Sequence, residues 1–270
     1  MDVEEIRNRL HCLADKEKAK VLQRFFKTGP GEYGEGDRFL GIKVPELRKM
    51  AKAHESVGYG AVRGLLKSPI HEERFLALLI LILKYSKGDE TEKKKIYGFY
   101  LKHTPWVNNW DLVDASAEHI VGAFLAKKDK APLYRLARSD LLWERRIAIM
   151  ATFHFIKKNA FSETLKIAGM LLFDKEDLIH KAVGWMLREV GKRDLETEEA
   201  FLRVHYKAMP RTMLRYAIER FPEPKRQRYI KGEILKARAS SLFPKRSSGD
   251  RARALEKPSP LCGRGQGEGG

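Results

Sequence analysis

Hydrophobic residues recur at the spacing of amphipathic helices along most of the chain, and no strand-like alternation separates the helical segments. Residues 3–27 are expected to form one amphipathic helix or a helical pair. Pro45 suits the first turn of a helix that ends near His54. The same spacing predicts further helices over residues 58–67, 71–86, 90–102, 109–126, 132–138, 141–158, 163–173, 177–192, 196–208, 211–221 and 224–237.

A repeat runs through these helices. Five residues follow one another at intervals of 35, 36, 36 and 34 residues, and each opens an apolar helix or lies in its first turns: Arg74, Asn109, Arg145, Lys181 and Arg215. A period of this length without strands is typical of stacked helical pairs, which build a curved solenoid with a concave binding surface. The sequence therefore predicts an all-α solenoid, and the basic residues of the repeat predict that its groove is cationic.

Two segments are not expected to belong to the helical stack. Thr28 to Asp37 is polar and rich in glycine, and we expect a turn-rich connection, because the segment lacks the Gly-Lys-Ser/Thr end of a P-loop and follows no strand. From Ser240 onward the chain is mostly Ser, Pro, Gly and Arg and has little to bury. We expect a helical domain over residues 1–238 and a disordered tail over residues 239–270.

The chain is strongly basic, with 53 Lys and Arg against 36 Asp and Glu, a formal charge of +17. Residues 240–270 contain six basic and three acidic residues, so the rest keeps 47 minus 33, or +14. The charge therefore belongs to the helical domain. Such a charge can serve solubility alone, but it also indicates an acidic polymer as a partner, and a long positive groove suits a phosphate backbone.

Several classes of protein are excluded by what the chain lacks. Cys12 and Cys262 stand at opposite ends and cannot form a disulfide framework or a cysteine-based metal site. The eight histidines show no paired metal-binding spacing, and no GxSxG nucleophile elbow is present. The most apolar run, Leu76 to Leu83, is far shorter than the ~20 residues of a membrane helix. We expect a cytosolic protein that needs no metal, cofactor or membrane.

The residues that could carry out a reaction lie between Trp106 and Asp114. On a helix that begins near Asn109, Trp110 and Asp114 are four residues apart, so an indole and a carboxylate project from one face. The same two residues could instead be a core tryptophan and an exposed or arginine-paired carboxylate. Two other copies of the repeat favour a functional site, because they bring more basic and aromatic residues to helix starts: Trp143, Arg145, Arg146, Lys181, Trp185 and Arg188.

Five motifs of the chain resemble one known family. They are Phe39-Leu40-Gly41-Ile42-Lys43-Val44-Pro45-Glu46-Leu47-Arg48, Trp110-Asp111-Leu112-Val113-Asp114, Trp143-Glu144-Arg145-Arg146, Lys181-Ala182-Val183-Gly184-Trp185-Met186-Leu187-Arg188-Glu189 and Pro210-Arg211-Thr212-Met213-Leu214-Arg215-Tyr216-Ala217. Together they resemble the AlkD-like DNA alkylation repair glycosylases, which are built of HEAT-like repeats, over roughly residues 3–235. The resemblance implies a HEAT-like helical-repeat solenoid.

The resemblance also implies roles for particular residues. Trp110 and Trp185 are implied as aromatic walls against the damaged nucleotide, Asp114 as the catalytic carboxylate and Arg146 as a contact to the DNA backbone. Phe25 stands where relatives often have a tyrosine in the same cleft, so stacking is retained while a phenol hydroxyl is absent. Further phosphate contacts are expected from Arg74, Arg145, Lys181, Arg188, Arg211 and Arg215.

The reaction implied is hydrolysis of the N-glycosidic bond of purines alkylated at N3 or N7, such as 3-methyladenine and 7-methylguanine, in double-stranded DNA. A base that already carries a positive charge leaves without protonation, so one carboxylate can replace the pair that most sugar hydrolases use. We expect a monomeric, monofunctional glycosylase without a deep base pocket. Two alternatives remain open, namely a non-catalytic HEAT-like protein that binds damaged or branched DNA, and a protein-binding scaffold.

Overall fold

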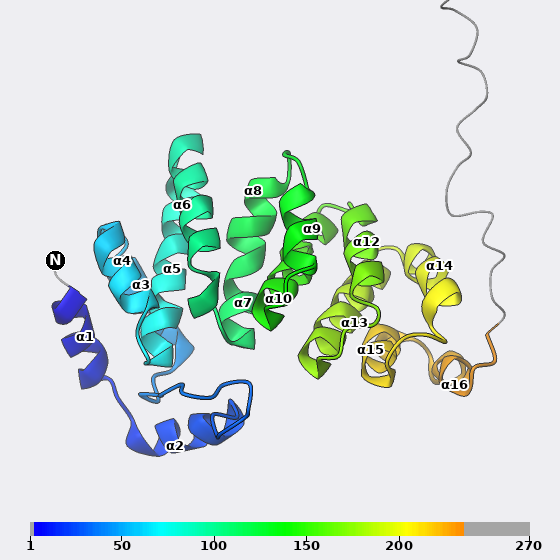
Figure 1. The fold of residues 1–270 in the computed structure, drawn as a ribbon, viewed down its shortest axis with the longest axis horizontal. Helices are drawn as coiled ribbons and strands as arrows, with labels where there is room; N and C mark the ends of the chain where they lie inside the picture. Colours follow the sequence, from blue (N-terminus) through cyan, green and yellow to red (C-terminus); the bar gives the residue numbers. More distant parts are fainter. Residues whose placement is uncertain (1–2, 235–270) are drawn as a thin grey trace, which may run out of the picture. The chain divides into compact units, whose positions relative to one another are not determined.

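The computed structural model describes residues 3–234, and Figure 1 shows how their helices are arranged. This part of the chain consists of helices and connections and contains no strand beyond one isolated bridge between Arg38 and Ile70. The predicted all-α helical-repeat fold is confirmed. The tail expected over residues 239–270 lies outside the described residues, as do the last residues of the helix predicted over 224–237.

The elements follow one another in two groups along the chain. The first group comprises α1 (Val3–Cys12), α2 (Lys16–Phe25), α3 (Val44–Ala53), α4 (Tyr59–Leu66), α5 (His71–Lys87), α6 (Glu90–Lys102), the short η1 (Thr104–Trp106), α7 (Trp110–Ala117), the π turn η2 (Glu118–Gly122) and α8 (Ala123–Leu125). The second group comprises α9 (Ala131–Ala137), α10 (Leu142–Ala151), α11 (Phe153–Ile156), α12 (Ser162–Met170), α13 (Asp177–Gly191), α14 (Leu195–His205), α15 (Arg211–Ala217), η3 (Ile218–Arg220) and α16 (Glu223–Lys231).

Three predicted helices differ in detail from the observed ones. The segment over residues 3–27 is a helical pair, because Asp15 caps α2 by accepting a 3.0 Å hydrogen bond from the Lys18 amide. The helix predicted over 109–126 continues from α7 to α8 through a π turn. The helix predicted over 141–158 is divided at Thr152 into α10 and α11.

The helices of residues 3–234 form two rows. In the inner row, α5, α7, α10, α13 and α15 each pack against the next, and the outer row includes α6, α9, α12 and α14, which pack on the inner helices (Figure 1). The buried hydrophobic side chains form one continuous cluster from Ile6 to Tyr229. None of the helices in this described part is long and apolar enough to cross a membrane. The row of inner helices is what positions the candidate site.

The predicted repeat has the right period but joins three different helical positions, of which Asn109 is the N-cap itself. The residues that cap the inner helices at their N-termini are Ile70, Asn109, Leu141, Glu176 and Pro210. Counted from these caps, Arg74 and Arg145 are fourth residues, whereas Lys181 and Arg215 are fifth residues. Successive residues on a helix are rotated by about 100°, so the two positions face different surroundings.

In three inner helices the fourth residue makes a hydrogen bond to the turn before the helix. Arg74 and Arg145 each donate from Nη1 to the carbonyl six residues earlier, which is that of Ser68 at 2.9 Å and that of Ser139 at 3.0 Å. The ring of His180 makes the equivalent contact in α13, at 2.6 Å. These side chains therefore hold the turns that lead into α5, α10 and α13 against those helices. The fifth residues after the caps are Phe75, Asp114, Arg146, Lys181 and Arg215.

Gly184, the glycine of the Lys-Ala-Val-Gly-Trp motif, lets α15 approach α13 closely. A Cβ atom there would lie 2.4 Å from the Met213 carbonyl oxygen and 2.5 Å from Cβ of Tyr216. We expect Gly184→Ala to lower the free energy of unfolding by about 1–3 kcal/mol, because the backbone of α15 would have to move. Urea denaturation measures this change. Gly98→Ala in α6, where a Cβ meets nothing within 4 Å, is the matched control and should stabilise or leave stability unchanged.

Candidate active site

A cavity of about 590 Å³ lies between α7, α10, α13 and the segment that follows α2. We call it the Asp114 cavity. Six residues that the sequence analysis selected line it: Phe25, Trp110, Asp114, Arg146, Lys181 and Trp185. The other lining residues are Lys27, Tyr33, Glu176, Asp177, Leu178 and Tyr216. The fold therefore brings together residues from four inner helices, α7, α10, α13 and α15, with residues from the end of α2 and the segment after it.

Asp114 and Arg146 form a bidentate ion pair in this cavity. Nε of Arg146 donates to Oδ1 of Asp114 at 2.9 Å, and Nη2 donates to Oδ2 at 2.8 Å. Nη1 of Arg146 donates to the Leu178 carbonyl of α13. Burial raises the pKa of Asp114, and the charge and hydrogen bonds of Arg146 act in the opposite direction. The pair fixes the plane of the carboxylate, and both partners face the cavity.

The two indoles of the site are supported by other rings. Trp110 stacks on Phe26 with ring centroids 5.2 Å apart and an interplanar angle of 13°, and Phe25 meets it edge-on at 6.1 Å. The indole N–H of Trp185 donates to Glu189 at 3.2 Å, and Phe153 lies 6.2 Å from its ring. Packed neighbours restrict the rotation of both indoles, so each presents a defined surface to the cavity.

The Asp114 cavity is balanced in charge. Its lining contains three basic residues and three acidic ones, since Asp114, Glu176 and Asp177 accompany Lys27, Arg146 and Lys181. Lys181 pairs with Asp177 at 2.7 Å within α13. The positive charge of the chain is thus not concentrated in the cavity, and the lining as a whole offers no net attraction to a phosphate group. The cationic groove predicted from the sequence stays a prediction.

Arg74 is not on the surface where phosphate contact was expected, and this part of the sequence prediction is corrected. Its side chain is 3% exposed, and Nη2 donates to Asp37 at 2.6 Å. Because Arg74 occupies the fourth position after its helix cap, it points into the interior beside His71. Asp37 also accepts a hydrogen bond from Asn109 at 3.1 Å. Asp37 therefore joins the connection before α3 to the starts of α5 and α7.

The four other expected phosphate contacts lie outside the Asp114 cavity. Arg145 is engaged by Asp174, with Nε to Oδ2 at 2.6 Å, and its side chain is largely buried. The phosphate contact predicted for Arg145 stays a prediction. Arg188 pairs with Glu219. The two that are exposed, both on α15, are Arg211 and Arg215.

Sequence reasoning missed several residues of the cavity. Tyr33 belongs to the glycine-rich segment that was predicted only as a connection, and its ring meets that of Trp143 at 6.2 Å. This segment folds back over the starts of the inner helices. A phenol therefore lines the cavity even though Phe25 lacks one. The only signal was that Tyr33 is the single aromatic residue between Thr28 and Asp37.

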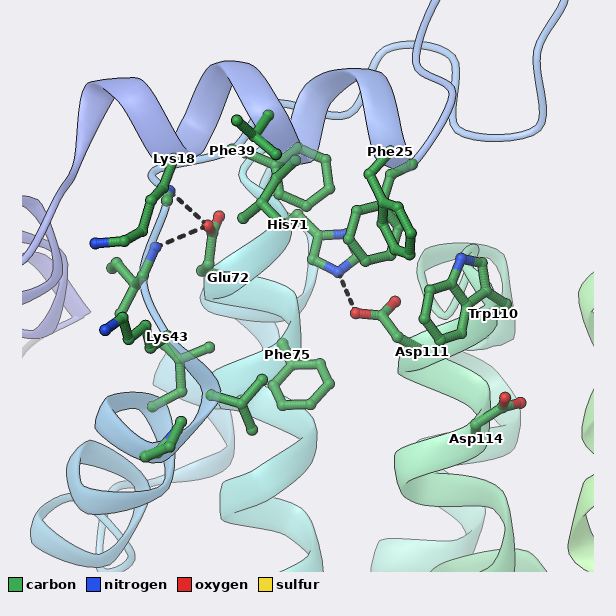
Figure 2. A pocket seen from close by; sticks show the side chains of 18 residues that line it. Lys18, Phe25, Phe39, Lys43, His71, Glu72, Phe75, Trp110, Asp111 and Asp114 are labelled. Atoms are coloured by element: carbon green, nitrogen blue, oxygen red, sulfur yellow. Dashed lines mark hydrogen bonds and ion pairs between the residues drawn. The ribbon is translucent and has the colours of Figure 1, made fainter.

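A second cavity, of about 690 Å³, lies beside the first under α2 (Figure 2). We call it the aromatic cavity. It shares Phe25, Trp110 and Asp114 with the Asp114 cavity, and its further ring-bearing lining residues are Phe26, Phe39, His71 and Phe75. Burying the polar edge of a nucleobase among such side chains without hydrogen bonds is unfavourable. The lining is therefore poorly suited to read a base.

Across residues 3–234, no three His, Cys, Asp or Glu side chains gather in a way that could hold a metal ion.

The chain was compared with known proteins. The model of the DNA alkylation repair enzyme family matches residues 6–221. A solved structure described as a predicted DNA alkylation repair enzyme from Enterococcus faecalis is similar, with a TM-score of 0.60, 17% identity and coverage of 78% of this chain and 97% of that chain. AlkD2 from Streptococcus mutans aligns with a TM-score of 0.49 and 18% identity, covering 77% of this chain and 99% of that chain. Comparison with curated proteins gave no match.

These likenesses differ in what they show. At 17% identity, the Enterococcus faecalis structure shows a shared helical fold and nothing of the chemistry. The family match runs from α1 to the start of the connection before α16 and includes every residue of the Asp114 cavity. The chain belongs to the DNA alkylation repair enzyme family.

Proposed function

We propose that this protein is a monofunctional DNA glycosylase that removes positively charged N3- or N7-alkylated purines from double-stranded DNA. The observation that carries the proposal is that the Asp114 carboxylate and two indoles, Trp110 and Trp185, line a single cavity. The family consists of DNA alkylation repair enzymes. The carboxylate and the two indoles in one cavity support the proposal that the group removed is a positively charged base.

The lining of the cavity suits a cation. An indole face attracts a positive charge by about 0.5–2 kcal/mol per contact, and two indoles, Trp110 and Trp185, line the cavity. A neutral base gains no such attraction. Selectivity for alkylated purines would then follow from charge, without hydrogen bonds that read the base edge.

The positive charge that must be stabilised during the reaction develops on the sugar. As the bond between C1′ and the base nitrogen breaks, its electron pair goes to the base, which becomes neutral, and positive charge develops on the sugar. The Asp114 carboxylate stabilises this charge and orients the water whose oxygen adds to C1′, and the proton that this water loses passes to solvent. The products are the free base and an abasic site. Arg146 holds the carboxylate, and its remaining N–H capacity is available to a phosphate beside the lesion.

Lys181 lines the Asp114 cavity, and its surroundings argue against a Schiff-base step. Its hydrogen bond with Asp177 raises the pKa of the ammonium group, so the charged, non-nucleophilic form is favoured. This supports a monofunctional reaction, in which the DNA strand stays intact after the base is released.

Base release tests the proposal. Incubated with duplex DNA containing 7-methylguanine, the protein is expected to liberate free 7-methylguanine, measured by chromatography, and to leave the strand unbroken until alkali is added. Duplexes with O6-methylguanine, which carries no charge, should release no base. Absence of release from the charged lesion, or equal release of the neutral one, would contradict the proposal.

One observation favours a second candidate, a non-catalytic protein that binds damaged DNA. Both oxygens of Asp114 are engaged by Arg146, and a carboxylate so neutralised is less able to stabilise a sugar cation. Tight binding of 7-methylguanine DNA over many hours without base release would support this candidate.

A further inference from the structure

His71 lies between two carboxylates beside the candidate site. Its side chain is 3% exposed, with Nδ1 at 3.1 Å from Oδ2 of Asp37 and Nε2 at 2.8 Å from Oδ2 of Asp111. Figure 2 shows the second contact, from the start of α5 to the start of α7. The carboxylates come from different segments, since Asp37 belongs to the connection before α3 and Asp111 to α7.

The geometry fits a charged ring. An ionised carboxylate only accepts hydrogen bonds, and the imidazolium, with its two N–H groups, is the form of His71 that can donate to both carboxylates. The charged groups that face the ring are Asp37 from the connection, Asp111 from α7 and Arg74 from its own helix, whose Nη2 lies 3.5 Å from Nδ1. Burial lowers the pKa of His71, but the hydrogen bonds to Asp111 and Asp37 outweigh it and raise that pKa.

His71 is joined to Trp110 by two routes. Through the chain, Asp111 is the residue directly after Trp110 in the first turn of α7. Through space, the His71 ring stacks on Phe39 with centroids 4.5 Å apart, Phe39 stacks on Phe26 at 4.9 Å, and Phe26 stacks on Trp110 at 5.2 Å. A shift of the imidazole would therefore displace both the start of α7 and the rings that support the Trp110 indole.

We propose that His71, as an imidazolium, is a positioning residue that holds the Trp110 indole in place by bridging Asp37 and Asp111. The inference rests on the proposed function for its effect on catalysis, because Trp110 is a wall of the Asp114 cavity there. His71 lines the aromatic cavity and is not among the residues of the Asp114 cavity, so it acts through its neighbours.

The sign of the pH dependence follows from the raised pKa. The bridge is complete near and below pH 6.5, the ordinary pKa of histidine. It is lost as the pH rises through the higher pKa of the folded protein, because the neutral ring can donate to only one carboxylate and Asp37 and Asp111 then repel each other. Base release should therefore fall on the alkaline side, together with a change in the surroundings of Trp110.

The test compares wild type with His71→Gln, which keeps a polar side chain but cannot donate in two opposite directions. Single-turnover release of 7-methylguanine is measured from pH 6 to 9, and ¹⁹F NMR of 5-fluorotryptophan follows the Trp110 resonance over the same range. In wild type both should titrate with one midpoint. In His71→Gln the rate should be about 10- to 100-fold lower at neutral pH, and the Trp110 resonance should be shifted and independent of pH.

The control is His54→Gln. His54 is also buried, but its Nδ1 lies by the Met50 carbonyl at 2.8 Å and it lines neither cavity. This variant should behave as wild type. A His71→Gln protein with the wild-type rate and an unshifted, titrating Trp110 resonance would overturn the inference. Should wild type release no base, the proposed function fails, and the Trp110 resonance still decides whether His71 positions the indole.

A second variant covers the case in which His71→Gln does not fold. Asp111→Asn removes one carboxylate while keeping the shape of the side chain, and loss of that charge should lower the midpoint of the Trp110 titration. An unchanged midpoint in this variant would also overturn the inference.

Discussion

Asp37→Ala is expected to lower the free energy of unfolding by about 3–5 kcal/mol, the cost of removing one partner from a buried ion pair. The Asp37 side chain is 4% exposed. In the sequence, Asp37 is distant from the residues proposed for chemistry. Urea denaturation at pH 7, followed by circular dichroism, measures the change. Asp140→Ala, at an exposed aspartate, should change stability by less than about 0.5 kcal/mol.

The large effect follows from what Asp37 holds. Its carboxylate accepts hydrogen bonds from His71, Arg74 and Asn109, which belong to the starts of two inner helices. Burial raises the pKa of Asp37, but the hydrogen bond from His71 and the charge of Arg74 outweigh it and lower that pKa. Without the carboxylate, two buried cationic side chains would lose this shared partner. A decrease of less than about 1 kcal/mol in the free energy of unfolding of Asp37→Ala would contradict this account and show that water reaches the cluster of Asp37, His71 and Arg74.

The helical repeat could be predicted from the sequence because it depends on local spacing. The period of about 35 residues reappears in the inner helices, and Pro45 lies in the first turn of α3 as expected. The position of each basic residue relative to its helix cap was harder to predict. Arg74 and Lys181 are both basic residues near helix starts, yet they differ by one position from the helix cap, and that difference sends one side chain into the interior and the other to a cavity.

The candidate site was predictable where its residues share a helix and a motif. Trp110 and Asp114 lie four residues apart on α7, and the structure places both on the Asp114 cavity. The cluster around Asp37 was not predictable, because Arg74 and Asn109 are 37 and 72 residues away from it. No local pattern indicates such a pairing. Tyr33 escaped prediction for the same reason, since only the tertiary fold brings its segment to the cavity.

Asp114→Asn is expected to reduce the rate of base release by about 10²-fold or more, the order of effect of a positioned carboxylate in a transition state. The amide keeps the shape of the side chain and one oxygen, but it carries no negative charge to stabilise the sugar cation. The bidentate pair with Arg146 at 2.9 and 2.8 Å would also be weakened, so stability must be compared alongside activity.

Asp174→Asn supplies the matched control. It weakens the equivalent ion pair of Arg145, in which Nε lies 2.6 Å from Oδ2 of Asp174, but neither partner lines the Asp114 cavity. Both variants should bind lesion-containing DNA and unfold at similar urea concentrations. Only the Asp114 variant should lose base release.

Single-turnover release of 7-methylguanine, with each protein in saturating excess over the DNA, compares the chemical step directly among wild type, Asp114→Asn and Asp174→Asn. We expect wild type and Asp174→Asn to release the base at comparable rates and Asp114→Asn to fall at least about 10²-fold below them while DNA binding is retained. Release by Asp114→Asn at the wild-type rate would contradict the role of this carboxylate in the reaction.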